Sequence, residues 1–230
     1  MKAESAAFIL HRQNYGETSK ILRCFTREYG RIDIICKGCR QGGKQARIME
    51  PFRRYRLAWS GRGELKTLNQ ADEIALYSLS TVQDRLYSGF YINELLSQIV
   101  KTAVAEMDLF DLYAKTLSEL AVCPLSAIRY VLRRFELALL QSMGYGISLD
   151  VERDGQTKIS PAQAYGFEPE HGLFATSSRQ QILASGDTII ALREGKFENI
   201  RQEKEARRLM RFILGSYLPN TSIQSRKLFA

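Results

Sequence analysis

The chain has 230 residues, of which 45% are hydrophobic and 25% are charged, and its formal net charge is +8 at pH 7. These proportions are ordinary for globular proteins, and they exclude intrinsically disordered, collagen-like and coiled-coil classes. The length suggests one or two domains, and no apolar run approaches the roughly 18 residues that a membrane-spanning helix requires.

Residues 6–72 are expected to form short strands, because apolar and polar side chains alternate there and turn residues interrupt the runs. The turns are at 15–17, 29–30 and 61–63. The predicted strands are 7–12, 20–26, 31–36, 52–60 and 64–68. Five short strands in about 65 residues suit a small closed barrel, of which the OB-fold is the commonest five-stranded form.

After residue 75 the spacing of apolar residues changes to that of helices. Residues 81–84 fit a capping box, and the helix that follows carries apolar residues from Leu86 to Val100. Further helices are predicted at 108–121, at 126–143 before Gly144, at 178–184, at 187–192 and at 201–218 before Pro219. Residues 148–176 contain several glycines and prolines, which predicts an irregular insertion.

These patterns predict an α+β fold with two domains. Residues 1–76 are expected to form an N-terminal five-stranded OB-fold barrel that binds nucleic acid. Residues 77–230 are expected to form an all-helical C-terminal domain, with the irregular insertion at about 148–176.

One short motif nearly matches a nucleotide-binding loop. Residues 38–45, Gly-Cys-Arg-Gln-Gly-Gly-Lys-Gln, approach the pattern G-x-x-x-x-G-K-[ST]. Gln45 stands where Mg²⁺ needs a hydroxyl group, and Pro51 follows too soon for the long helix that would hold the phosphates. We therefore predict a basic loop between two strands, with a P-loop nucleotide hydrolase as a minor alternative.

Cys36 and Cys39 have C-x-x-C spacing, which suggests half of a zinc site or a redox pair. No second pair of ligands follows at zinc-site spacing, so we expect structural cysteines, with Cys36 inside the barrel and Cys39 in the loop. The first residues carry Glu4 and only five apolar residues before His11, which is not typical of a signal peptide. We therefore expect a cytoplasmic protein whose four cysteines are reduced.

Basic residues are concentrated in the first third of the chain. Residues 1–72 contain 15 Lys and Arg against 7 Asp and Glu, whereas the remaining residues contain 18 of each kind. A surface of one sign attracts a polyanion, although a solvated basic face without a partner is the alternative.

We expect the barrel and its loops to bind single-stranded nucleic acid through phosphate contacts and base stacking. Strand alternation places Arg54 and Arg56 on one face and Tyr55 and Trp59 on the other. Tyr15, Tyr55 and Trp59 are candidates for stacking, and the alternative places Tyr55 and Trp59 in the barrel core. The predicted binding residues are Arg31, Lys37, Arg40, Lys44, Arg47, Arg53, Arg54, Arg56, Arg62, Lys66 and Tyr15.

Several long strings of residues are spread over nearly the whole chain. In the first part they are residues 7–11, 15–19 (Tyr-Gly-Glu-Thr-Ser), 25–28 with Gly30-Arg31, Lys37-Gly38 and 61–68 (Gly-Arg-Gly-Glu-Leu-Lys-Thr-Leu). In the second part they are residues 86–96, 132–140 with Gly144-Tyr145-Gly146, and Ser225-Arg226 with Leu228-Phe229. Together these strings resemble the RecO family of bacterial recombination mediators.

The resemblance implies an OB domain joined to a helical domain, binding to single- and double-stranded DNA, and annealing of complementary strands without enzymatic activity. It also implies partnership with RecR and docking on the acidic C-terminal tail of the single-stranded-DNA-binding protein, so that RecA can load on coated strands during gap repair. Many relatives carry a cysteine-rich zinc module, but residues 144–176 contain no cysteine, so we expect no metal and no cofactor. An RNA-binding OB-fold protein without a role in repair is the alternative.

The partner tail needs an apolar pocket edged by a guanidinium group, because arginine can hold a carboxylate with two hydrogen bonds. Arg129 and Arg133 lie one turn apart on the predicted helix 126–143, beside apolar neighbours, and we expect them to bind the tail. The alternative is that both form ion pairs within the protein, with Glu136 or with other acids of the helical bundle.

Overall fold

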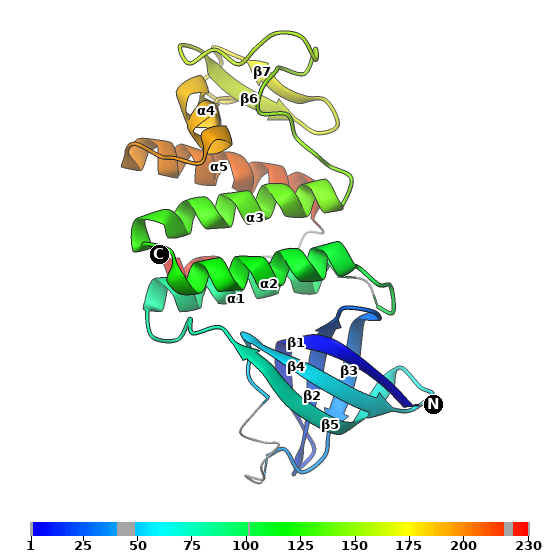
Figure 1. The fold of residues 1–230 in the computed structure, drawn as a ribbon. Coiled ribbons are helices and arrows are strands. Elements are labelled where there is room, and N and C mark those ends of the chain that lie inside the picture. Colours follow the sequence, from blue (N-terminus) through cyan, green and yellow to red (C-terminus); the bar gives the residue numbers. More distant parts are fainter. Residues whose placement is uncertain (1, 41–48, 101, 219–222, 230) are drawn as a thin grey trace. The chain divides into compact units, whose positions relative to one another are not determined.

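The computed structural model describes residues 2–40, 49–100, 102–218 and 223–229. A closed five-stranded barrel precedes a helical region, so the predicted α+β class is confirmed (Figure 1). The chain divides into two compact units. Residues up to Val122, together with those from Ile223 onward, form the first unit, and residues 123–222 form the second. The domain division after residue 76 stays a prediction.

The barrel consists of β1 (Lys2–Tyr15), β2 (Ser19–Thr26), β3 (Gly30–Cys36), β4 (Arg53–Ser60) and β5 (Leu65–Leu76). Around the barrel the order is β1–β2–β3–β5–β4, and every neighbouring pair is antiparallel except β3 with β5. The five predicted strands are therefore confirmed. Strands β1 and β5 are longer than the sequence pattern indicates.

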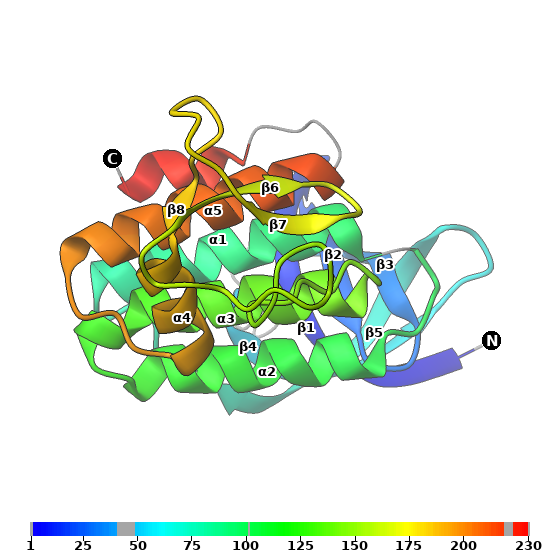
Figure 2. The same cartoon turned by 90° about the horizontal axis from the view of Figure 1, so that it is seen from above.

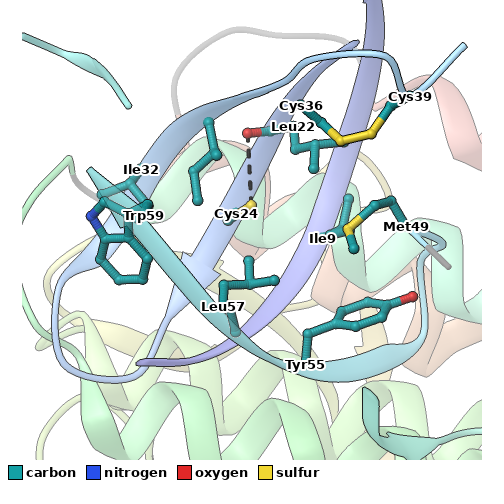
Figure 3. Packing of buried hydrophobic residues seen from close by; sticks show 12 residues of the cluster. Ile9, Leu22, Cys24, Ile32, Cys36, Cys39, Met49, Tyr55, Leu57 and Trp59 are labelled. Carbon is teal, nitrogen blue, oxygen red and sulfur yellow. Dashed lines mark hydrogen bonds between the residues drawn. A yellow bond between two sulfur atoms is a disulfide. The ribbon is translucent and has the colours of Figure 1, made fainter. Parts of the chain in front are cut away.

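Alternating side chains of the strands fill the barrel interior (Figure 3). On β4, Tyr55, Leu57 and Trp59 point inward and are at most 4% exposed. Arg54 and Arg56 therefore point outward, as the alternation of a strand requires. Tyr55 and Trp59 belong to the core, which was the alternative to their stacking on bases.

Cys36 and Cys39 form a disulfide at the end of β3 (Figure 3), so the expectation of four reduced cysteines is wrong for this pair. Cys36 points into the barrel, as strand alternation predicts. The turn that follows brings Cys39 back to the core, where it is 2% exposed, instead of leaving it in the loop. Cys24 and Cys123 lie outside this disulfide and are buried, and burial raises the pKa of Cys24.

Helices α1 (Gln83–Ile99) and α2 (Met107–Val122) belong to the same compact unit as the barrel. The ring of Phe8 on β1 lies 4.9 Å from Phe110 and 4.7 Å from Tyr113, both on α2. Phe25 on β2 lies 5.4 Å from Phe110. Burial of these rings stabilises the packing of α2 on one outer face of the barrel.

The C-terminal segment η3 (Gln224–Phe229) is a 3₁₀ helix held by α1. The carboxylate of Glu94 accepts hydrogen bonds from the backbone N–H groups of Gln224, at 2.7 Å, and Ser225, at 2.8 Å. At the other end of α1 the predicted capping box is wrong. The N-cap is Val82 in place of Thr81, and no side chain caps the helix.

The second unit contains α3 (Ile128–Ser142), α4 (Gly186–Glu194), α5 (Ile200–Tyr217) and the short 3₁₀ helix η2 (Leu125–Ala127). Three predicted helices are thereby confirmed. The unit also contains a three-stranded sheet of β7 (Gly172–Ala175), β6 (Ala164–Glu168) and β8 (Ala184–Ser185), in that order (Figure 2). No helix in the described residues is long and apolar enough to cross a bilayer.

This sheet corrects two predictions. The C-terminal region is not all-helical, because part of the supposed irregular insertion forms the hairpin of β6 and β7. The helix predicted at 178–184 is absent from these described residues, since the N–H of Leu183 donates to the carbonyl of Tyr165 on β6 at 2.8 Å. Strands of two to five residues among glycines and prolines are too short to show a clear alternation.

Replacing the N-cap of α5 is expected to destabilise the second unit by about 1 kcal/mol. The side-chain oxygen of Asn199 accepts a hydrogen bond from the N–H of Gln202 at 3.1 Å, and Asn199→Ala removes this acceptor. Denaturant unfolding measures the change in free energy. Asn199→Ser keeps an acceptor and is the control, so equal losses in the two variants would show that the cap does not stabilise the helix.

Candidate nucleic-acid interface

OB-folds bind oligonucleotides on the face of their second and third strands, between the loops that join strands 1 to 2 and 4 to 5. In this barrel those loops are residues 16–18 and 61–64. The outer face of β2 and β3 carries the ion pair of Arg23 with Asp33, in which Nε and Oδ1 are 3.4 Å apart. Ile21 and Ile35 lie opposite each other on the same face and are partly buried.

The loops at one end of this face bring together three of the predicted binding residues. Tyr15 ends β1 and is 51% exposed, and Lys37 and Arg40 follow β3 and are exposed. The N–H of Arg40 donates to the carbonyl of Thr18 at 2.9 Å, and its guanidinium group donates to the carbonyl of Gly16. Arg40 therefore holds the start of its loop against the β1–β2 turn while keeping its charge.

The loop between β4 and β5 carries Arg62, and Lys66 follows it at the start of β5, where it pairs with Ile34 of β3. This loop lies beside the start of β1, because Ser60 pairs with Lys2. Arg62 is exposed, and Nζ of Lys66 donates to the carbonyl of Gly63 at 2.7 Å, which keeps the ammonium group beside the loop. Neither Arg62 nor Lys66 forms an ion pair with a carboxylate in the part of the chain that the structure describes. The predicted Lys44 and Arg47 lie outside the described residues.

Two of the predicted arginines are occupied or buried. Nη1 of Arg53 lies 2.5 Å from Glu73 and Nη2 lies 3.3 Å from Glu50, and the hydrogen bond to Glu73 raises the pKa of Arg53. Nε of Arg54 is buried and has no hydrogen-bond partner among the described residues. A phosphate could reach Arg53 only by displacing its carboxylates, so we expect little contribution from this side chain.

Arg31 and Arg56 lie apart from Lys37 and Arg40. Arg31 begins β3, six residues or about 20 Å from Lys37, and donates to the hydroxyl of Thr102 at 2.7 Å. Arg56 lies 3.6 Å from Glu4, and both side chains are more than half exposed. Such an exposed pair is worth little, so Arg56 can exchange this partner for a phosphate.

Arg12 and Lys20 lie on the β1–β2 hairpin near Tyr15 and were not among the predicted binding residues. Arg12 donates to the carbonyl of Met49 at 3.0 Å, and Lys20 lies opposite Asn14. The sequence contained part of the information needed to find Lys20, because the predicted strand 20–26 begins with this residue. Only the pairing of β1 with β2 shows that both cations reach the end of the barrel where Lys37 and Arg40 lie.

We call the loop cluster the set of cations on the β1–β2 hairpin, on the loop after β3 and around the β4–β5 loop that make no ion pair among the described residues. These are Arg12, Lys20, Lys37, Arg40, Arg62 and Lys66. Such cations can bind phosphates without leaving a carboxylate of the protein unpaired. With the exposed ring of Tyr15, the cluster has the parts that single-strand binding uses.

The two arginines expected to bind the partner tail differ in exposure. Arg133 is buried, and Nη2 lies 2.5 Å from Oε1 of the fully buried Glu136. Arg129 is 57% exposed, and its Nε lies 3.2 Å from Glu203 on α5. Both therefore form the intramolecular ion pairs that were the alternative, and only Arg129 has a side chain that a peptide can reach without rearrangement.

No cluster of three histidine, cysteine, aspartate or glutamate side chains able to hold a metal ion occurs in the described residues. The Cys36–Cys39 pair supplies only two sulfur atoms, and both are joined in the disulfide. A closed zinc site takes four ligands, so the described part of the site does not suit zinc as it stands.

Comparisons with known proteins agree along the whole chain. The family model described as Recombination protein O N terminal matches residues 1–77, and the one described as Recombination protein O C terminal matches residues 81–226. The chain is 39% identical to the DNA repair protein RecO of Vibrio parahaemolyticus over 224 residues, which cover 96% of this chain and 90% of that protein. It is 37% identical to the DNA repair protein RecO of Methylococcus capsulatus, over 97% of this chain and 91% of that protein. It is 40% identical to the DNA repair protein RecO of Vibrio cholerae, over 96% of this chain and 91% of that protein.

Proposed function

The chain belongs to the RecO family of DNA repair proteins, and from this membership we propose that it anneals complementary single strands and acts with RecR to load RecA. The strands would be those coated with single-stranded-DNA-binding protein during gap repair. The observation that supports this proposal most directly is the loop cluster, whose cations are free of ion pairs in the described residues and which includes an exposed tyrosine beside Arg40 and Lys20.

Annealing needs no covalent catalysis, so the proposal requires no catalytic residue and no cofactor. Two DNA strands repel each other because both are polyanions. A protein that neutralises phosphates and leaves the base edges accessible lowers the barrier to their encounter. Lys37 and Arg62 are placed on loops, and Lys66 lies at the start of β5 next to such a loop, where their long side chains can follow a flexible strand. This role belongs in the cytoplasm, where the nucleoid lies.

Docking on the acidic tail of the single-stranded-DNA-binding protein is the finer part of the proposal. We assign it to the exposed face of α3 around Arg129, because a guanidinium group can bind the terminal carboxylate. Arg133 does not take part directly, since its side chain is turned inward to Glu136. Binding of the tail would replace the 3.2 Å ion pair of Arg129 with Glu203.

The proposal predicts that the purified chain accelerates annealing of complementary strands coated with single-stranded-DNA-binding protein, without added nucleotide. Annealing is measured by the quenching of a fluorophore on one strand by a quencher on the other. Bare strands and coated strands are compared, with and without ATP. A rate on coated strands equal to that without the chain would contradict the proposal.

Competition with oligomers of the same sequence in DNA and RNA separates this function from that of an RNA-binding protein. Displacement of bound DNA by a lower concentration of RNA than of unlabelled DNA would favour RNA as the ligand. Turnover of ATP in the same samples would indicate the P-loop enzyme.

A further inference from the structure

Helix α5, drawn orange to red in Figure 2, carries a row of exposed cations on one face. Lys204, Arg207, Arg208 and Arg211 follow each other at the spacing that places side chains on the same side of a helix. The apolar positions of α5 are buried on the opposite side. From Lys204 to Arg211 the row extends over seven residue steps, or about 10 Å of helix.

Two acidic residues of α5 stand where they would ordinarily neutralise this row. Glu203 precedes Arg207 by four residues, and Glu205 precedes Arg208 by three, and ion pairs form at both spacings. Both carboxylates are instead engaged elsewhere. Their partners are Nε of Arg129 at 3.2 Å for Glu203, and the N–H of Ser185 at 2.9 Å and the hydroxyl of Thr188 at 2.7 Å for Glu205.

The positive charge of the row is therefore not compensated locally. Lys204, Arg207 and Arg211 make no ion pair within the described ranges of the chain. Nε of Arg208 donates to the carbonyl of Leu183 at 2.6 Å, which orients its guanidinium group without neutralising it. Residues 73–230 contain equal numbers of acidic and basic residues, so their composition does not show that the bases of α5 are separated from its acids.

An aromatic ring lies next to the row. Phe212 is 46% exposed and follows Arg208 by one helical turn, so its ring and the cations share a surface. Gly215 lies one turn further along, and a Cβ atom built there would meet nothing within 4 Å. Packing therefore does not require glycine at this position, although alanine would favour the helix by about 1 kcal/mol. The glycine leaves open space beside the ring of Phe212.

We propose that this cationic face of α5, formed by Lys204, Arg207, Arg208 and Arg211 with Phe212, binds the backbone of a single DNA strand as a second strand-binding surface. The inference rests on the proposed function, because a protein that anneals DNA gains from holding two strands. A length of about 10 Å matches about three phosphates of a strand that keeps the stacked spacing of roughly 3.4 Å per phosphate. Phe212 offers a face on which one base can stack.

An acidic peptide is the less suitable ligand for this face. Peptides that dock with an aromatic anchor need a pocket that buries it. The cationic face of α5 instead presents a ring that is itself exposed, beside a row of positive charges. A polymer with regular negative charge and flat bases fits this arrangement better.

The test uses the full chain with Lys204→Ala, Arg207→Ala and Arg211→Ala together, called the α5 variant. Its matched control removes the same charge at three exposed lysines outside both surfaces, Lys115, Lys158 and Lys196. The probe is a labelled 35-mer of thymidylate, and the readouts are the number of strands bound per chain and the annealing rate. Melting followed by circular dichroism verifies folding, and a variant with glutamine at the three α5 positions replaces the alanine variant if that one fails to fold.

We expect the unmodified chain and the control to bind two strands per chain. In the α5 variant one binding event should weaken about a hundredfold at 0.1 M salt, because three phosphate contacts contribute about two units of log K. The other binding event should keep its affinity, and annealing should slow at least tenfold.

Each other result contradicts a definite part of the proposal. If the α5 variant still binds two strands and anneals them at an unchanged rate, α5 is not a strand-binding surface, and the proposed function remains. Loss of all strand binding would make α5 the main site, so the surface would not be a second one. Unchanged strand binding with lost affinity for an acidic peptide would reassign the face to a protein partner. If the unmodified chain bound two strands without annealing them, the proposed function would fail, while strand number in the α5 variant would still decide the inference.

Discussion

Removal of three cations from the loop cluster is expected to weaken binding to the thymidylate 35-mer about a hundredfold at 0.1 M salt. The variant combines Lys37→Ala, Arg62→Ala and Lys66→Ala. Each phosphate contact of a single strand adds about 0.7 to the slope of log K against log salt, so three lost contacts lower log K by about 2 at this concentration. The three side chains form no ion pair among the described residues, so no carboxylate loses its partner and the fold should persist.

The salt dependence of strand binding provides a second test of the loop cluster. If the unmodified chain contacts about five phosphates, the slope is about −3.5, and affinity falls roughly a hundredfold between 50 and 200 mM salt. The variant should show a slope of about −1.4. Fluorescence anisotropy titrations at four salt concentrations measure both slopes. The lysine control at positions 115, 158 and 196 loses equal charge and should keep the full slope.

Two results would contradict the phosphate-binding role of the loop cluster. A slope near zero for the unmodified chain would mean that phosphate contacts do not dominate binding. Equal slopes for the loop-cluster variant and the control would mean that net charge alone matters. In that case Lys37, Arg62 and Lys66 would have no special place in the site.

Arg133→Ala is expected to reduce the free energy of unfolding of the second unit by about 3–5 kcal/mol. The substitution removes the guanidinium group that lies 2.5 Å from Glu136, whose side chain is fully buried. A buried carboxylate without this counter-charge loses much of its compensation for desolvation. Replacing both residues by leucine should cost far less, because neither charge then needs to be buried. Denaturant unfolding of the three proteins measures the differences.

Arg129→Ala is the matched control on the same helix. Its ion pair with Glu203 is partly exposed, so the loss should stay below about 1 kcal/mol. The same variant should weaken binding to a peptide with the acidic tail sequence of the single-stranded-DNA-binding protein. A loss of stability below 1 kcal/mol for Arg133→Ala would show that water reaches its pair with Glu136. Unchanged peptide affinity in Arg129→Ala would remove the tail from this face of α3.

The elements with strong local patterns could be predicted from the sequence. Tyr55, Leu57 and Trp59 alternate with outward residues on β4, and the strand period alone places them on one face. The helices α2, α3 and α5 each have an apolar side at helical spacing. The concentration of cations before residue 72 also follows from composition.

The elements without such patterns could not be predicted. Strands β6, β7 and β8 have two to five residues each, and their pairing depends on backbone hydrogen bonds between segments that carry no period. The disulfide depends on how the turn after Cys36 curves, because strand alternation ends at that residue. The capping residue of α1 depends on backbone angles at Val82 rather than on the presence of a threonine.

By itself, the sequence determined the barrel, the main helices and the surplus of positive charge, because all three depend on residue types at short and regular spacing. Only the tertiary structure decided which cations are available. Arg53 binds Glu73, Arg133 binds Glu136, and Glu203 binds Arg129 in place of Arg207. The physical reason is that a charge is neutralised by whichever opposite charge the fold brings within a few ångströms, and strand register and helix packing set that distance between residues far apart in the chain.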